Sequence, residues 1–472
     1  MRDRYKVVRL LPVLTVMVVA IFGVQSCFVT KNYEEPKDEK QFMFRLDSLQ
    51  KGEEDALGEV KWRAFFSDPI LIKHIDSALA NNFNNQIALQ SIEAADAYFK
   101  QSKMGFFPTL QVGAEAQRQQ VSPNSRFGEF FNEVLYQYDL SASLSWEADI
   151  WGKIASQKRS REAQFLQSVT AQQAVQTRLI SNVANTYYQL LAADQRKQIL
   201  EKTISVRSKS LQTIRDLKQA GQTTQLAVNQ SAAQVDEAKA LLADVEQQIF
   251  TLENSLSILK GKHTMYIERS KLSEQEFPDD FVVGKPASIL ANRPDVREAE
   301  LVYRSSFEQV NVARASMYPS VQLSLTGGFQ SLETTNWISP NSFFTTLIGG
   351  ITQPIFMRRQ LLTQLDVSKT QAEQNFMAFK QTVLNAGMEV NNALKDYDIQ
   401  NRKLEIRKRQ ENHLTNALEN AEDLLKNGYA NYLEVLNVQE SLLNIQLQRT
   451  TTESARLQSA TELFRALGGG VE

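Results

Sequence analysis

The chain of 472 residues has one cysteine, 11 prolines and three histidines. A single cysteine excludes an intrachain disulfide. So few prolines, together with 42% hydrophobic residues, argue against disorder over most of the length. The formal net charge is −2, and Lys and Arg are dispersed, so the chain lacks the basic footprint of a nucleic-acid-binding protein.

The sequence also lacks the usual marks of an enzyme. His74, His263 and His413 are far apart, and none has a metal-ligand spacing with Cys, His or a carboxylate. There is no Gly-rich phosphate loop and no G-x-S-x-G elbow. We therefore expect no catalysis and no cofactor or metal other than a covalent lipid, for which the reason follows.

The N-terminus has the pattern of a secretory signal. Arg2, Arg4, Lys6 and Arg9 precede an apolar run over residues 10–24, which is shorter than the roughly 20 residues of a membrane-spanning helix. The only cysteine, Cys27, follows it, and a lipid-modified N-terminal cysteine would explain this position. An ordinary signal peptide followed by a stray thiol is the alternative. We predict a signal peptide over 1–26 and a lipidated tether over 27–61, rich in Lys, Asp and Glu.

Beyond the signal, no stretch is apolar enough to cross a bilayer as a helix. Any membrane crossing must therefore use strands.

An internal repeat organises the rest of the chain. The run Phe107-Pro108-Thr109-Leu110-Gln111-Val112 returns as Tyr318-Pro319-Ser320-Val321-Gln322-Leu323, and Asp149-Ile150-Trp151 returns as Pro354-Ile355-Phe356. The tract around Gly221 returns around Gly428. We predict a first repeat over 62–262, a connection over 263–294, a second repeat over 295–466 and a short tail over 467–472.

Each repeat is predicted to contain a helix, two strands, a very long helix, a Gly turn and a second long helix. In the first repeat these elements cover residues 68–104, 109–120, 137–147, 154–219 and 225–262. In the second they cover residues 295–316, 320–332, 343–352, 359–426 and 432–466. The fold class is therefore mainly α with a small β part.

The long helices have the spacing of coiled coils. Leucines and other apolar residues from Leu242 to Leu259 recur in steps of three and four, and the same pattern runs from Leu433 to Leu447. A helix over 154–219 would be about 100 Å long, far more than a globular core requires. On these seams alone, a solid coiled-coil rod remains an alternative.

The predicted strands alternate between apolar and polar residues. From Tyr136 to Glu147 the apolar side chains stand on one face and the polar ones on the other, with aromatics at both ends. A soluble sheet edge would explain any single strand. Four strands at equivalent repeat positions instead favour a membrane barrel, and four cannot close one alone, since such barrels begin at about eight. The chain must then associate, giving eight, twelve or sixteen strands around a water-filled lumen.

The chain resembles the TolC-like outer-membrane efflux family, specifically the lipoprotein branch that serves resistance-nodulation-division pumps. The most specific match runs from Val283-Gly284-Lys285-Pro286 through Arg293-Pro294-Asp295-Val296. Further matches are Trp62 with Asp68-Pro69, the pair Asn81-Asn82, Asn32-Tyr33 with Pro36, and Gly428 with Tyr432-Leu433-Glu434-Val435-Leu436. Together they cover nearly the whole mature chain.

The resemblance implies a homotrimer in the outer membrane of a Gram-negative bacterium. Each chain would add four strands to a shared twelve-stranded barrel and its long helices to a coiled-coil tunnel in the periplasm. The trimer would be a passive duct for drugs, toxic compounds or metabolites, docked to a periplasmic adaptor and an inner-membrane pump. Outer-membrane lipid would be a further partner.

The resemblance also implies that side chains just before the two Gly turns close the duct. The candidates for this periplasmic gate are Asp216 with Lys218, and Glu422 and Asp423 with Lys426. Gly221 and Gly428 are predicted to form the tunnel-tip turns, because a tight turn between two helices needs a residue tolerant of positive φ. Plain solvated surface is the alternative for each carboxylate.

Two other functions are compatible with parts of this pattern. A lipidated periplasmic adaptor or scaffold is also built on long helical hairpins. A duct for protein secretion would have the same architecture as one for small molecules. The lipoprotein signal and the connection motif favour small-molecule efflux.

Overall fold

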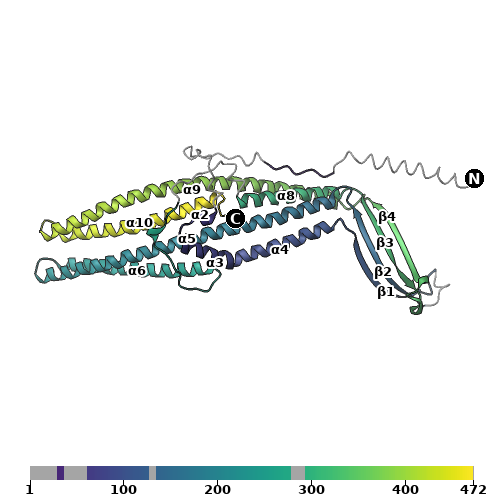
Figure 1. Ribbon diagram of the computed structural model, residues 1–472, viewed down its shortest axis with the longest axis horizontal. Helices are drawn as coiled ribbons and strands as arrows, with labels where there is room; N and C mark the ends of the chain where they lie inside the picture. The colour runs from purple at the N-terminus through teal and green to yellow at the C-terminus, as the bar shows by residue number, and fades with distance from the viewer. Residues whose placement is uncertain (1–28, 37–60, 127–133, 278–292, 471–472) are drawn as a thin grey trace, which may run out of the picture. The chain divides into compact units, whose positions relative to one another are not determined.

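The computed structural model describes residues 29–36, 61–126, 134–277 and 293–470 (Figure 1). The predicted signal peptide, Cys27, most of the tether and the motif from Val283 to Asn292 lie outside the described residues. Within the described part, no helix is both long and apolar enough to span a membrane.

Corresponding helices of the two halves have equal lengths. They have 67 residues in α5 (Lys153–Gln219) and α9 (Gln360–Lys426), and 35 in α6 (Gln225–Leu259) and α10 (Tyr432–Ala466). They have 22 residues in α4 (Phe83–Met104) and α8 (Pro294–Ala315). These equal lengths support the internal repeat, and the predicted helix boundaries agree with them to within a few residues.

The chain divides into two compact units, and each unit contains segments of both repeats. The first, here called the strand unit, lies within residues 1–35, 93–166 and 300–378. The second, the helical unit, lies within residues 36–92, 167–299 and 379–472.

The strand unit contains a four-stranded antiparallel sheet of order β1-β2-β3-β4 (Figure 1). Its strands are β1 (Thr109–Gln120), β2 (Val134–Ala148), β3 (Ser320–Ser331) and β4 (Phe343–Thr352). The short 3-10 helices Thr334–Asn336 and Pro340–Ser342 lie between β3 and β4. All four predicted strands are confirmed, and β2 is longer than the predicted 137–147.

The register turns the alternation of each strand into rows across the whole sheet. Leu110, Leu144, Leu325 and Leu347 are paired in turn, while their neighbours Gln111, Ser143, Thr326 and Thr346 form the next row. The two rows point to opposite faces because successive residues of a strand alternate. Ser143 and Thr326 are hydrogen bonded at 3.1 Å. The sheet thus has one apolar and one polar face over these rows.

In the same unit, polar side chains join α5 to α8. The Arg159 guanidinium donates two hydrogen bonds to Glu308, at 2.8 and 2.9 Å, and the Glu308 side chain is only 2% exposed. Ser160 Oγ lies 3.1 Å from Ser305 Oγ. A bidentate pair satisfies a carboxylate that would otherwise be costly to bury.

The helical unit contains the two helical hairpins and the shorter helices α2 (Trp62–Phe65) and α3 (Pro69–Asn81), together with the 3-10 helix Leu272–Glu274. The prediction of one helix over 68–104 is wrong, because the chain is extended at Asn82, between α3 and α4. Asn82 accepts from the Asn85 amide N–H and donates to the Leu259 carbonyl, at 3.2 and 2.9 Å. The break is thus fixed by a side chain that joins α4 to α6.

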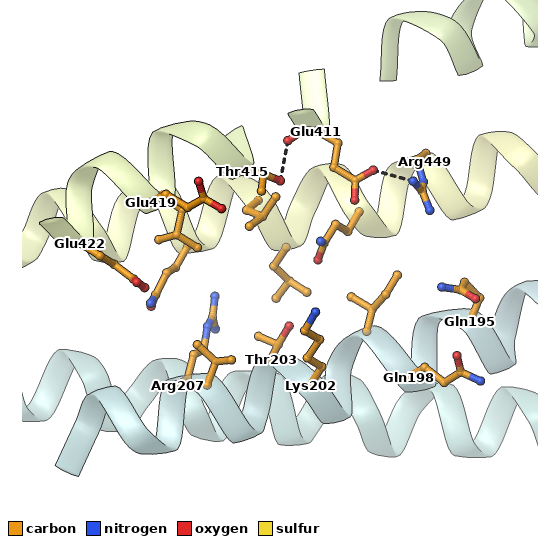
Figure 2. Close-up of a pocket in the computed structure, with 17 residues that line it drawn as sticks. Gln195, Gln198, Lys202, Thr203, Arg207, Glu411, Thr415, Glu419, Glu422 and Arg449 are labelled. Carbon is orange, nitrogen blue, oxygen red and sulfur yellow. Dashed lines mark hydrogen bonds and ion pairs between the residues drawn. The ribbon is translucent and has the colours of Figure 1, made fainter. Parts of the chain in front are cut away.

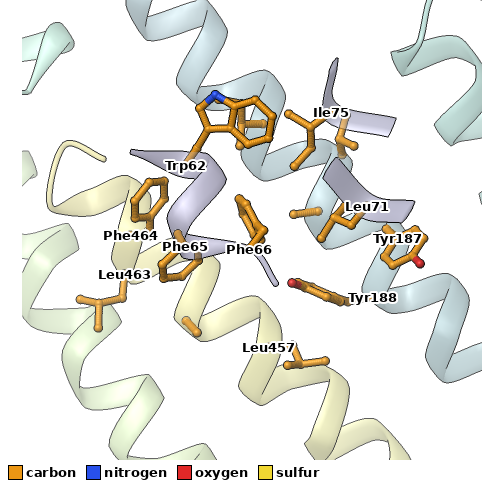
Figure 3. Packing of buried hydrophobic residues seen from close by; sticks show 14 of the residues in the cluster. Trp62, Phe65, Phe66, Leu71, Ile75, Tyr187, Tyr188, Leu457, Leu463 and Phe464 are labelled. Atoms are coloured by element: carbon orange, nitrogen blue, oxygen red, sulfur yellow. The ribbon is translucent and has the colours of Figure 1, made fainter. Parts of the chain in front are cut away.

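Aromatic residues from distant parts of the sequence form the centre of the helical unit (Figure 3). Phe65 stacks on Phe464 with ring centroids 4.3 Å apart, and Phe66 meets the same ring edge-on at 6.2 Å. Trp62 and Tyr187 are fully buried beside them. Large apolar rings contribute most to a core per residue, so this cluster anchors α2 and α3 onto α5 and α10.

A buried carboxylate lies next to this core. Asp68 caps α3 through the Ile70 amide (2.8 Å) and accepts further hydrogen bonds from Ser270, Tyr187 (2.8 Å) and Gln275 (3.0 Å). Burial raises the pKa of Asp68, but these hydrogen bonds outweigh burial and hold the pKa below its usual value. The network fixes the connection after α6 to both α3 and α5.

The Arg-Pro-Asp step at the start of α8 also has a structural role. The Arg293 guanidinium is buried and contacts Asp295 at 2.6 Å, Glu389 at 2.8 Å and the Ala466 carbonyl at 3.0 Å. It therefore links the beginning of α8 to α9 and α10.

Candidate functional site

A cavity of about 500 Å³ lies in the helical unit between α5 and the pair α9 and α10 (Figure 2). Cationic side chains come from α5 and carboxylates from α9, and Figure 2 shows both pointing into the same space. The charged residues of the lining are Lys202, Arg207, Glu411, Glu419, Glu422 and Arg449. Opposite charges on two helical hairpins therefore face each other across a polar space.

Arg207 is the most buried of these charges, with a side chain 3% exposed. It donates to the Gln234 backbone oxygen of α6 at 2.8 Å, and the Glu237 carboxylate lies 3.9 Å away. Burial lowers the pKa of Arg207, and attraction by Glu237 and Glu440 opposes that lowering. Arg207 thus stays charged and ties α5 to α6 on one side of the cavity.

Two further contacts hold the surrounding helices. Arg449 of α10 forms an ion pair with Glu411 of α9 at 2.8 Å. The hydroxyls of Tyr432 on α10 and Ser231 on α6 lie 3.2 Å apart, which joins the second hairpin to the first. Each hairpin is therefore fastened internally, and Tyr432 bridges the two near their ends.

Both hairpins end in the same backbone turn. Gly221 has φ of 76° and Gly428 has φ of 78°, in the left-handed region. In each turn the glycine N–H and the following N–H bond back to the last turn of the helix, at 3.0 and 2.9 Å after α5 and at 3.1 and 2.9 Å after α9. This pattern is the Schellman motif, which satisfies terminal carbonyls and favours glycine.

The predicted gate residues occupy different surroundings. Glu422 is half-buried and lines the cavity. Asp216 is exposed and accepts from Gln212 at 2.9 Å, and Asp423 is exposed and paired with Lys426 at 3.1 Å. Lys218 donates to Gln225 across the first turn. Within one chain, Glu422 is the gate candidate that belongs to the cavity.

The sequence reasoning did not single out Lys202, Arg207, Glu411, Glu419 or Arg449. A signal exists for part of this set, because Glu411, Thr415, Glu419 and Glu422 recur every three or four residues and so share a face of α9. The α5 residues are about 200 positions earlier in the sequence, and only the fold brings them opposite.

No group of three or more His, Cys, Asp or Glu side chains that could hold a metal ion occurs among the residues with described positions.

Comparison with known proteins identifies the family. The family model described as outer membrane efflux protein matches residues 74–262 and 286–469. The solvent efflux pump outer membrane protein SrpC of Pseudomonas putida is 26% identical over 457 residues, covering 96% of this chain and 97% of that protein. The probable outer membrane lipoprotein SilC of Salmonella typhimurium is 26% identical over 417 residues, covering 87% and 88%.

Among solved structures, the open-state MtrE outer membrane channel of Neisseria gonorrhoeae has a TM-score of 0.84 at 23% identity. The match covers 94% of this chain and 99% of that one. The chain belongs to the outer membrane efflux protein family, which confirms the resemblance, the fold class and the outer-membrane location. Its function is that of an outer-membrane efflux channel, and the family consists of channel proteins rather than enzymes.

Proposed function

We propose that this member of the outer membrane efflux protein family forms a homotrimer that acts as a passive duct for small molecules. The observation that carries the proposal is the sheet, whose order β1-β2-β3-β4 leaves β1 and β4 without a partner on their outer sides. Unpaired strand edges are costly in lipid, so edges of neighbouring copies must pair. Three copies give twelve strands.

The exposed apolar face of the sheet supports contact with lipid. Leu110, Val112, Leu347 and Ile351 are 68, 71, 67 and 74% exposed. The opposite face, with Ser143 and Thr326, would line a water-filled lumen, as the polar interior of membrane barrels does. Neither face offers groups for chemistry, so energy for transport would come from a resistance-nodulation-division pump joined through a periplasmic adaptor.

We further propose that Asp216, Glu422 and Asp423 close the periplasmic end of the duct. All three stand within two helical turns of the Schellman turns that end the hairpins. Threefold symmetry would gather nine carboxylates around one axis, and such rings favour cations and repel anions.

A covalent lipid on Cys27 is proposed as the anchor. The preceding argument from sequence gains support from residues 29–35, which dock onto α8 in the strand unit. Lys31 and Asn311 exchange two hydrogen bonds, at 3.0 and 2.9 Å, and Tyr33 packs edge-on against Phe307 at 5.7 Å. Cys27 is two residues before Val29, so it lies within about 7 Å of this docked segment. Mass spectrometry of the N-terminal peptide should find the acyl groups.

Small-molecule cargo is favoured by the relatives, since SrpC is named for solvent efflux. The decisive experiment is planar-bilayer conductance of the purified oligomer. Discrete conductance steps are expected, and they should be larger or more frequent when Glu422 and Asp423 are both replaced by Ser. A pure trimer that inserts but gives no discrete steps even with both substitutions would contradict the channel.

A further inference from the structure

Within the strand unit, a stripe of small residues on α5 is fully covered. Ser156, Ser160 and Ala163 each have 0% exposure. The cover is α8, because Ser160 Oγ lies 3.1 Å from Ser305 Oγ and accepts from Gln309 at 2.8 Å. Next to this contact, Arg159 and Glu308 form their bidentate pair.

The same stripe on α9 is uncovered. Because α5 and α9 both have 67 residues, Ser160 and Val367 each occupy the eighth position of their helix. The fourth and eleventh positions, Ser156 and Ala163 in α5, correspond to Thr363 and Thr370 in α9. All three α9 residues are exposed, Val367 by 58%.

The complementary face is uncovered on α4. Since α4 and α8 both have 22 residues, Ser305 and Glu308 of α8 correspond to Ala94 and Ala97 of α4. Ser305 and Glu308 are buried, whereas Ala94 and Ala97 are exposed. The chain therefore contains one complete helix seam and the two separate halves of a second one.

We propose that α4 of a second copy of this chain covers the exposed stripe of α9, packed as α8 packs on α5. The proposal rests on the trimer proposed above and identifies the helix contact that joins its subunits. The sheet gives the same direction of assembly, because α4 leads into the free strand β1 and the free strand β4 leads into α9.

The chemistry of this second seam differs from that of the first. The equivalents of Arg159 and Glu308 are Asp366 and Ala97, so the seam between copies contains no matching ion pair. Val367 would instead pack on Ala94 and on Tyr98, which is 56% exposed and occupies the position of Gln309. Small apolar residues allow helices to approach closely without a desolvation cost for charges.

The test is a pair of cysteines, Ala94→Cys with Val367→Cys, in the full-length protein purified from membranes. Ser160 and Ser305 have a spacing that suits a disulfide, and the new pair takes the equivalent positions. Mild oxidation should convert most of the protein to covalently linked dimers and trimers. Each single variant should give none, which also controls for any free thiol at Cys27.

Two matched pairs make the result decisive. Ser160→Cys with Ser305→Cys should form a disulfide within one chain and add no mass. Ala94→Cys with Met377→Cys should not crosslink, because Met377 lies ten residues farther along α9, about 15 Å away.

Failure of the seam and failure of the trimer can be told apart by native mass spectrometry. A trimer in which Ala94→Cys and Val367→Cys do not link would overturn the seam and leave the channel proposal standing. A trimer in which Val367→Cys reacts fully with a bulky water-soluble maleimide would overturn it as well. A stable monomer in every condition would contradict both proposals.

Discussion

The helical unit contains two regions of opposite character that share the same helices. The packed centre, formed by Trp62, Phe65, Phe66, Tyr187 and Phe464, is dry and aromatic. The hairpin cavity, lined by Lys202, Arg207, Glu411, Glu419, Glu422 and Arg449, is polar and charged. Both α5 and α10 contribute to each region, so position along a helix decides its environment. We infer that the centre supplies stability and that the hairpin ends are left free to respond to partners.

The largest expected effect comes from opening the packed centre. Phe464→Ala should lower the free energy of unfolding by about 3–5 kcal/mol, because it leaves a cavity beside Phe65 and Phe66. Denaturant titration of the purified protein measures this loss. Tyr429→Ala is the matched control, since Tyr429 is 83% exposed in the second hairpin turn and should cost less than about 0.5 kcal/mol. Equal losses for both variants would remove the distinction between the two regions.

The next effect concerns the buried carboxylate beside the centre. Asp68→Asn should cost about 1–3 kcal/mol by leaving hydrogen-bond donors unsatisfied. Because the folded pKa of Asp68 is depressed, its contribution is present above the unfolded pKa of 3.8 and is lost as pH falls below it. Thermal melts at pH 3 to 7 should therefore show less loss at acidic pH for the variant than for the parent. An unchanged acid slope would be evidence against this role.

A smaller effect is expected at the hairpin turns. Gly428→Ala and Gly221→Ala should each cost about 1–2 kcal/mol, because φ of 78° and 76° is unfavourable for a residue with a Cβ. Nothing lies within 4 Å of the added Cβ at either position, so backbone strain is the only cause. Gly113→Ala is the control, because that position also has open space and no positive φ. Similar melting temperatures for all three variants would contradict this origin.

The smallest effect on stability and the largest on transport are expected in the hairpin cavity. Glu422→Gln should leave the melting temperature within about a degree, because the residue is half-buried in a polar space. Open probability and cation preference in planar bilayers should change. Glu405→Gln is the control, since Glu405 is exposed and paired with Lys408 on the same helix. A gate at Glu422 would be refuted if both variants conducted like the parent.

Much of the fold could be predicted because its signals are local. Strand alternation gave the boundaries of β1 and β4, and heptad spacing with a Gly turn gave the two hairpins. The break at Asn82 was missed because one of its hydrogen bonds goes to Leu259, 177 residues away. A helix pattern cannot indicate such a partner.

The site was less accessible to sequence reasoning. Glu422 was predicted from its place before a turn, but Arg207 and Lys202 enter the cavity from a helix that is distant in sequence. Likewise, Asp68 is recognisable as a helix cap before Pro69, while its bonds to Tyr187 and Gln275 depend on packing.

The sequence by itself determined the duplicated order of helices and strands, because periodicity, caps and glycine turns act within a few residues. Only the tertiary structure decided which helix faces are covered. Ser160 and Val367 hold the same position in equal helices, yet one is fully buried and the other is 58% exposed. Burial depends on the neighbouring element, and for Val367 the chain itself does not supply that neighbour.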